Sequence, residues 1–435
     1  MEWVTLGLIL LLGLLFLLAL GMPIAFSLGV LSTGAILILG KPELLTLVGQ
    51  TAYTTPGSFV LVAVPLFILL AEVLAAAEMT NDLFEAASSW FGRIPGSLAS
   101  GSVVGCAIFA ALTGSSSANT AALGSVCTPE MLRRGYDKGL ATGSVTAAGA
   151  LGILIPPSIL MIFYGSLTEQ SVGELFIAGV IPGIMLAALF VIYITLRCLY
   201  NPKLAPASDR RLSWREKWRS TMKIWWALLI VGLMMGGIYS GVCTATEAAG
   251  IGAFVAMLLG LFVAKKLTMK KLKLAVLRTV WVTCMVLFIM VGAMIFGYFT
   301  THLGIPQAIV NWVAQLQVSR WTIMVALNVV FLFLGCILDA ASIVMITIPI
   351  IYPIITKLGF DPIWFGVVVT VNMEIGMITP PMGLNLFVMK GIVPPEVSFQ
   401  DIVRGTLPFM VVQLIALALT IAFPELCLWL PRTMR

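Results

Sequence analysis

Long apolar runs recur along the whole chain and are separated by short polar connections. Each run is close to the length of about 20 residues that an α-helix needs to cross about 30 Å of hydrocarbon. The pattern predicts an all-α polytopic membrane protein with five spans in each half and no soluble domain. The predicted spans are 4–20, 24–39, 59–77, 140–164, 175–200, 224–239, 248–264, 280–300, 364–389 and 407–428.

Two further apolar regions, 98–127 and 321–355, are each interrupted by small polar residues. The interruptions are centred on residues 114–119 in the first region and on Asp339 and Ser342 in the second. We expect each arm to be too short to cross the bilayer, and we interpret both regions as re-entrant helical hairpins whose tips stop near the midplane. The alternative is a pair of ordinary spans joined by a tight loop.

Composition agrees with a membrane protein and disfavours an enzyme. Hydrophobic residues make up 60% and charged residues 10% of the chain, against about 45–50% and about 25% in soluble domains. The seven cysteines form no CxxC pair, and His302 is the only histidine, so a metal site built on His or a Ser/His triad would have no partners. We therefore expect no catalytic residues and no cofactor. The run 4–20 has no basic segment before it, which disfavours a signal peptide.

Basic residues indicate the orientation, since cytoplasmic loops are enriched in Lys and Arg. With the N-terminus outside, 20 of the 25 basic residues fall in connections on the cytoplasmic side. Both termini are then periplasmic, and the two hairpins enter from opposite sides. Because the basic residues form no continuous groove, we expect no nucleic-acid partner. The opposite side contains Lys41, Arg320, Lys357, Arg432 and Arg435.

An internal repeat relates the two halves at an offset of 224 residues, the separation of Pro129 and Pro353. Eight of the 29 positions from 129 to 157 are identical at this offset, where about two would be expected by chance. Five predicted spans separate the two hairpins, and this odd number makes the repeat inverted. Inverted repeats with broken helices near the midplane are typical of secondary transporters.

Two Pro-Pro motifs, at 156–157 and 380–381, interrupt two of the predicted spans at equivalent positions of the repeat. Proline lacks the N–H that would bond the carbonyl four residues earlier, so we expect unpaired carbonyls at Gly152 and Ile153 and at Gly376 and Met377. Each break is predicted to face a polar hairpin tip. Such oxygens suit a hard cation such as sodium, whereas the simpler alternative is a kink satisfied by a nearby serine.

The oxygens nearest these breaks form the predicted coupling-ion sites. A proton is the main competitor of sodium, and Glu72, Glu374 and Asp339 are the carboxylates to weigh as its carriers. No buried guanidinium is evident, so a substrate anion would meet bound cations and the N-terminal ends of half-helices. The predicted sodium-binding residues are Ser115, Ser116, Asn119, Gly152, Pro156, Asp339, Ser342, Gly376, Thr379 and Met382.

The motifs at 114–119, 128–136, 151–158 and 374–388 together resemble the large membrane subunit of the tripartite ATP-independent periplasmic (TRAP) transporters. The resemblance covers essentially the full length. It implies a sodium-driven elevator that takes an organic anion, such as a dicarboxylate or a sialic acid, from a soluble periplasmic binding protein. It also implies a small four-helix membrane subunit, expected here as a separate chain, and a bacterial inner membrane. The predicted substrate contacts are Ser117, Ser158 and Asn385.

We divide the chain accordingly into moving and fixed parts. Residues 98–170 and 321–392 are expected to form a transport domain of hairpins and broken helices. The remaining segments, 1–97, 171–279, 280–320 and 393–435, are expected to provide scaffold helices, connecting arms and basic cytoplasmic loops. Two other functions stay open: a self-sufficient ion-coupled dicarboxylate transporter of the same broad fold, and a membrane assembly component without transport activity.

Overall fold

The computed structural model describes residues 3–92, 94–206, 213–315 and 318–434. All the regular elements in these ranges are helices, which confirms the predicted all-α class. Four basic residues used for the orientation, Arg93, Arg210, Arg211 and Arg435, lie outside the described residues.

Within the described residues, the first half of the chain contains ten α-helices connected by short turns. They are α1 (Trp3–Ala19), α2 (Ile24–Ile38), α3 (Leu45–Thr54), α4 (Ala63–Ala76), α5 (Thr80–Phe91), α6 (Ser97–Thr113), α7 (Ser116–Arg133), α8 (Lys138–Ala150), α9 (Ile159–Thr168) and α10 (Val172–Tyr200). Single turns of 3₁₀ helix are η1 (Pro42–Leu44), η2 (Phe59–Val62), η3 (Leu151–Ile153) and η4 (Pro202–Leu204).

The second half continues with helices of similar order and length. They are α11 (Trp214–Met222), α12 (Trp225–Tyr239), α13 (Ala245–Leu258) with the π turn η5 (Leu259–Val263), α14 (Met269–His302), α15 (Ile305–Gln315), α16 (Arg320–Gly335), α17 (Ala340–Lys357), α18 (Pro362–Ile378), α19 (Leu384–Ile392), α20 (Phe399–Ala422) and α21 (Glu425–Arg432).

Helix boundaries follow the internal repeat. The offset of 224 residues carries α7 onto α17 at both ends and the first residue of α8 onto the first residue of α18. It also carries the last residue of α9 onto the last residue of α19. One difference separates the halves, because α3 and α4 of the first half correspond to the single 34-residue helix α14 of the second.

Not every predicted span is a full-length helix. Within the described ranges six helices are long and apolar enough to cross a membrane, or seven if α11 and α12, which meet at 59°, count as one bent span. The predicted spans 140–164 and 364–389 are broken as expected, into α8 and α9 and into α18 and α19. Predicted spans 4–20, 24–39 and 224–239 form shorter helices of 15 to 17 residues.

The expectation that every hairpin arm is too short to cross is wrong for α17. This helix has 18 residues and is one of the six of spanning length, which at 1.5 Å per residue gives about 27 Å. Pro349 and Pro353 lie inside α17 without ending it. The arm is therefore longer than an interrupted apolar pattern suggests.

One segment of the predicted basic loops is also a helix. Helix α11 begins with a capping box. The Ser213 side chain accepts a hydrogen bond from the N–H of Glu216, and the Glu216 carboxylate accepts one from the N–H of Ser213. The polar composition of α11 gave no span signal, so the pattern of apolar runs missed it. It precedes α12 and bends away from it.

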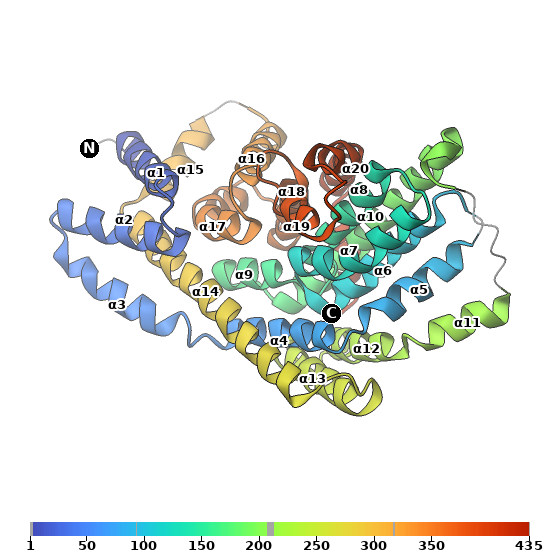
Figure 1. Ribbon diagram of the computed structural model, residues 1–435. Helices are drawn as coiled ribbons and strands as arrows, with labels where there is room; N and C mark the ends of the chain where they lie inside the picture. The colour runs from blue at the N-terminus through green and yellow to red at the C-terminus, as the bar shows by residue number, and fades with distance from the viewer. Residues whose placement is uncertain (1–2, 93, 207–212, 316–317, 435) are drawn as a thin grey trace.

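Helices of the two hairpins and the broken spans gather into one bundle, α6–α9 with α16–α20, above a curved row of peripheral helices that includes α3, α4, α5, α11, α12, α13 and α14 (Figure 1). Glycines allow close packing inside the bundle. A Cβ at Gly143 would lie 2.2 Å from the carbonyl oxygen of Gly405, and a Cβ at Gly405 would lie 2.0 Å from that of Gly139. Helices α8 and α20 are therefore in backbone contact, as small residues permit between membrane helices.

Polar contacts join connections that the basic-residue pattern assigns to the same side. Each bond links segments far apart in sequence. On the predicted cytoplasmic side the pairs are Lys271 with Glu78 at 2.8 Å, Lys138 with the Glu396 carbonyl at 2.7 Å and the Asp137 N–H with the Leu204 carbonyl at 2.9 Å. On the opposite side they are Gln170 with Tyr352 and Tyr239 with Thr433, both at 3.0 Å.

Candidate functional site

The first hairpin turns sharply between α6 and α7. Gly114 ends α6 in a left-handed conformation with φ of +63°, which residues with a Cβ rarely adopt. Ser115 then begins α7, and its Oγ accepts a hydrogen bond from the N–H of Ala118 at 3.5 Å. Ser115 and Ser117 are half-buried, while Ser116 is buried. Sequence and local geometry thus place a row of hydroxyls at the N-terminal end of a helix.

The first break lies between α8 and α9. No backbone N–H is available at Pro156 or Pro157, and the peptide bond between them is cis. Ser158 caps α9 by accepting from the N–H of Met161 at 3.3 Å, and its Oγ donates to the Ile153 carbonyl. The Ile153 carbonyl, which Pro157 leaves without its helical partner, is therefore satisfied by a serine, as the simpler alternative expected. For Gly152 an unpaired carbonyl stays a prediction.

The tip of the first hairpin is in direct backbone contact with the break between α8 and α9. A Cβ at Gly152 would lie 2.5 Å from the Ser115 carbonyl oxygen, and one at Gly114 would lie 2.6 Å from the Pro157 carbonyl oxygen. The N–H of Ile159 also donates to the Gly114 carbonyl at 3.4 Å. Two glycines thus make the approach possible, and the predicted ligands Ser115 and Gly152 are brought together.

Asn119 provides a buried oxygen at this contact. Its Nδ2 donates to the Cys106 carbonyl at 3.1 Å and to the Gly149 carbonyl at 3.3 Å. Its Oδ1 is buried and has no hydrogen-bond partner among the described residues, and the same holds for Oγ1 of the neighbouring Thr120. Buried acceptors are normally satisfied, so these oxygens fit the donor set that a hard cation requires.

The second hairpin has a carboxylate at the equivalent position. Asp339 begins α17, with Oδ2 accepting from the N–H of Ser342 at 3.1 Å and Oδ1 accepting from the Ser342 hydroxyl. Asp339 is half-buried and Ser342 is fully buried. The carboxylate is thus fixed at the helix N-terminus, where the dipole favours negative charge.

The second break lies against the C-terminal end of α16, the first arm of the second hairpin. A Cβ at Gly376 would lie 2.8 Å from the Cα of Gly335, and the N–H of Met382 donates to the Cys336 carbonyl at 3.3 Å. The peptide bond between Pro380 and Pro381 is cis. As in the first half, a hairpin and a broken helix meet where glycine leaves room.

One expected free carbonyl of the second break is paired. The N–H of Thr379 donates to the Gly376 carbonyl at 3.2 Å, so the expectation is wrong there, because the chain turns back on itself in place of the lost helical bond. For Met377 it stays a prediction. The Thr379 Oγ1 donates to the Ile375 carbonyl, and the Met382 side chain is 55% exposed.

The three predicted substrate contacts lie in different environments. Ser117 is half-buried, with its Oγ 3.5 Å from that of Ser115. Asn385 is fully buried, and its Nδ2 donates to the Ser116 Oγ at 2.8 Å and to the Thr146 carbonyl at 3.3 Å. Ser158 is also fully buried, and its hydroxyl is engaged with backbone groups. Asn385 therefore joins the second half of the chain to the first hairpin tip.

Two buried polar residues remain: Glu374, one of the three carboxylates considered as proton carriers, and Gln413, which the pattern of residues did not single out. Both side chains are fully buried, and none of their oxygen or nitrogen atoms has a partner among the described residues. They lie on the facing helices α18 and α20. Gln413 falls inside the predicted span 407–428, and an amide within an apolar run was the signal that could have drawn attention to it.

Glu72, the third carboxylate considered, is less buried than Glu374. Its Oε2 is 3.8 Å from Nη1 of Arg278, and its side chain is 27% exposed. The long distance to Arg278 and the partial exposure indicate that Glu72 lies near the surface of the helical bundle.

Comparisons with known proteins agree with this architecture. The C4-dicarboxylate TRAP transporter large permease protein DctM of Pseudomonas aeruginosa is 39% identical over 407 residues, covering 93% of each chain. The sialic acid TRAP transporter large permease protein SiaM of Vibrio cholerae is 31% identical, over 97% of this chain and 96% of the relative. The isethionate TRAP transporter permease protein DctMQ of Oleidesulfovibrio alaskensis is 33% identical, over 94% of this chain and 64% of the relative.

A solved structure shares the fold. The YdaH transporter of Alcanivorax borkumensis superposes with a TM-score of 0.59 at 16% sequence identity, covering 88% of this chain and 89% of that one. The family model described as the DctM component of the tripartite ATP-independent periplasmic transporters matches residues 11–426. The chain therefore belongs to this family of multi-pass membrane permeases, as its motifs predicted.

Proposed function

We propose that this chain is a sodium-coupled importer subunit that moves a small organic anion through the membrane by an elevator mechanism. The observation that carries the proposal is the backbone contact between a polar hairpin tip and a broken helix in the first half, with its counterpart in the second half. Ser115 meets Gly152, and Gly335 meets Gly376. Paired breaks at equivalent positions of a repeat favour a binding site over an isolated kink.

Sodium is the proposed coupling ion at two sites. The first contains Ser115, Ser116, Asn119, Gly152 and Pro156, and the unpartnered Oδ1 of Asn119 supports it. The second contains Asp339, Ser342, Gly376, Thr379 and Met382. These residues offer oxygen ligands, which suit a hard cation. Met382 contributes to this set through its position in the second break, whose backbone is bonded to the hairpin.

The proposed cargo is a carboxylate, such as a dicarboxylate or a sialic acid. Relatives named for C4-dicarboxylates and for sialic acid support this class. None of the described lysines and arginines is buried, so the anion would be held by cations and by the N-terminal ends of α7 and α17. Ser117, Ser158 and Asn385 are the proposed substrate contacts.

Movement is proposed to occur between two parts of the chain. Residues 98–170 and 321–392 would form the transport domain, and 1–97, 171–279, 280–320 and 393–435 would form scaffold and arms. Matching helix boundaries at the 224-residue offset support two inverted repeats of five spans and one hairpin each. Contacts between connections assigned to one side support that grouping of the connections, and the excess of Lys and Arg on one side supports a bacterial inner-membrane protein with both termini periplasmic.

The proposed partners are a soluble periplasmic binding protein and a small four-helix membrane subunit on a separate chain. The DctMQ relative, whose name joins the two membrane components, supports the second partner. We expect the binding protein to deliver the anion to the chain.

Reconstitution in liposomes tests the proposal. The chain and both partners are expected to accumulate organic acids only when an inward sodium gradient is present. Uptake without the binding protein would instead indicate a self-sufficient transporter. Uptake driven equally well by a proton gradient without sodium would contradict sodium coupling, and no uptake of any acid in the panel would favour an assembly component.

A further inference from the structure

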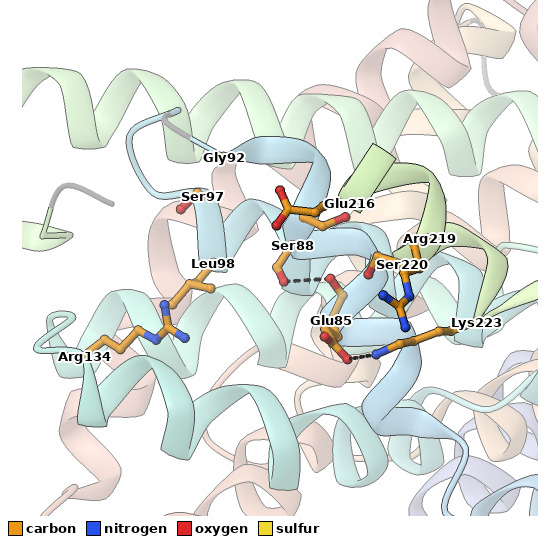
Figure 2. Close-up of a pocket in the computed structure, with 11 residues that line it drawn as sticks. Glu85, Ser88, Gly92, Ser97, Leu98, Arg134, Glu216, Arg219, Ser220 and Lys223 are labelled. Atoms are coloured by element: carbon orange, nitrogen blue, oxygen red, sulfur yellow. Dashed lines mark hydrogen bonds and ion pairs between the residues drawn. The ribbon is translucent and has the colours of Figure 1, made fainter. Parts of the chain in front are cut away.

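A polar cleft of about 270 Å³ opens between α5, the start of α6 and α11, away from both hairpin tips. Figure 2 shows Arg219 and Ser220 of α11, and Lys223 directly after it, on one side, with Glu85 and Ser88 of α5 facing them and Arg134 across the cleft. Arg134 follows α7, so the cleft is bounded by three segments that are distant in sequence.

Helix α11 has the composition of a helix that lies in a membrane interface. It meets the apolar helix α12 at 59°, so it does not continue that span. Trp214 and Trp218 are 72% and 60% exposed, and both pack edge-to-face with Trp90 of α5. The Lys217 ammonium lies 5.4 Å from the Trp214 ring centroid. Exposed tryptophans beside basic residues are typical of the headgroup region of a bilayer.

Among the residues that the structure describes, one cation of the cleft has no ion pair. Lys223 is paired with Glu85 at 2.8 Å, and Arg134 donates to Glu130 at 2.7 Å. Glu216 also lines the cleft, and its Oε2 accepts from the N–H of Ser213 at 2.7 Å. Arg219 has no ion pair among the described residues. Its guanidinium is therefore the donor in the cleft lining that no described carboxylate holds in an ion pair.

Ser220 provides a second, independent observation. It is 9% exposed and lines the cleft, and its Oγ has no hydrogen-bond partner among the described residues. A buried hydroxyl without a partner is uncommon. Beside a free guanidinium, it offers a donor to an anionic oxygen.

We propose that this cleft binds the phosphate of an anionic phospholipid from the cytoplasmic leaflet. Arg219 supplies the planar fork of donors that matches a phosphate, and Ser220 adds a hydroxyl donor. Trp90, Trp214 and Trp218 hold the helix at headgroup depth, with the acyl chains directed toward the membrane. Basic pockets between helices on the cytoplasmic side are suited to lipid headgroups. This assignment does not depend on the transported ion or substrate.

The experiment is native mass spectrometry of the full chain in detergent, titrated with phosphatidylglycerol or phosphatidylcholine. We expect phosphatidylglycerol to be retained at least about tenfold more strongly than phosphatidylcholine, and Arg219→Gln and Ser220→Ala each to reduce that preference. Arg215→Gln is the matched control, since it removes the same charge from the same helix outside the cleft, and it is expected to keep the preference.

Three results would overturn the proposal. One is an unchanged lipid preference in both Arg219→Gln and Ser220→Ala. The milder variant Ser220→Ala still tests the cleft if Arg219→Gln does not fold. Another is an equal loss in Arg215→Gln, which would indicate general surface attraction. The third is displacement of the lipid by millimolar inorganic phosphate, which would indicate a site for a soluble anion.

Discussion

Two residues at equivalent positions of the repeat carry different charges: Ser115 caps α7, and Asp339 caps α17. A full charge at the second tip contributes more to holding a cation than a neutral hydroxyl does at the first. Because each side chain also caps its helix, its removal has a structural cost of about 1 kcal/mol. The functional effect must therefore be separated from the capping effect.

We predict that Asp339→Ala raises the sodium concentration for half-maximal uptake by at least about tenfold, and that Ser115→Ala raises it by about fivefold. The measurement is uptake into liposomes over a series of inward sodium gradients. Ser398→Ala, which removes the N-cap of α20, is the control for capping alone. Unchanged sodium dependence in both tip variants would reduce the breaks to structural kinks.

Glu374 allows a prediction about stability. Its two carboxylate oxygens are buried without a described partner, and an unsatisfied buried polar group costs about 1–3 kcal/mol. We expect Glu374→Met to raise the thermal unfolding temperature in sodium-free detergent. Glu396→Met, at an exposed position, should change it little. A large loss of stability in Glu374→Met would show that the carboxylate holds a partner, such as a bound ion or water.

At the scale of elements, the contact between hairpin and broken helix depends on glycine. A Cβ at Gly152 would lie 2.5 Å from backbone of the first tip, so one of the two elements must move to admit it. We predict that Gly152→Ala lowers stability by about 1–3 kcal/mol and abolishes uptake. Unfolding curves and uptake assays measure the two effects.

Gly236→Ala in α12 is the control, because no atom lies within 4 Å of the position where its Cβ would stand. In a helix interior this change is expected to be neutral or slightly stabilising. Normal sodium-dependent uptake by Gly152→Ala would contradict the importance of the close approach.

The elements that sequence predicted best are those with a local signal. Repeated Pro-Pro motifs marked both breaks, and the small polar residues marked both turns. Helix α11 was missed because nine residues rich in Arg, Lys and Glu contain no apolar run, although Ser213 and Glu216 have the spacing of a capping box. The bond between Asn385 and Ser116 joins residues 269 positions apart, and no local pattern reports such a contact.

At the scale of the whole molecule, the chain is a transporter permease and not an enzyme, and its sidedness is open to direct measurement. In a cysteine-free background, we predict that a cysteine at Lys273 is labelled only from the cytoplasm and one at Gln307 only from outside. Impermeant maleimide applied to intact and to permeabilised cells distinguishes the two. The reverse pattern would overturn the orientation and the side from which each hairpin enters.

The hydrogen bond from Asn385 to the first hairpin tip has a consequence for cooperativity. Ordering either element orders its bonded neighbour, so occupancy of one half should increase affinity in the other. We expect sodium activation to be sigmoidal, and Asn385→Ala, if it still folds, to lower the Hill coefficient toward one while permitting sodium leak without cargo. Equal Hill coefficients in the two proteins would mean that the halves respond independently. A lower coefficient in Asn385→Ala would mean that a single amide separates tightly coupled import from slippage.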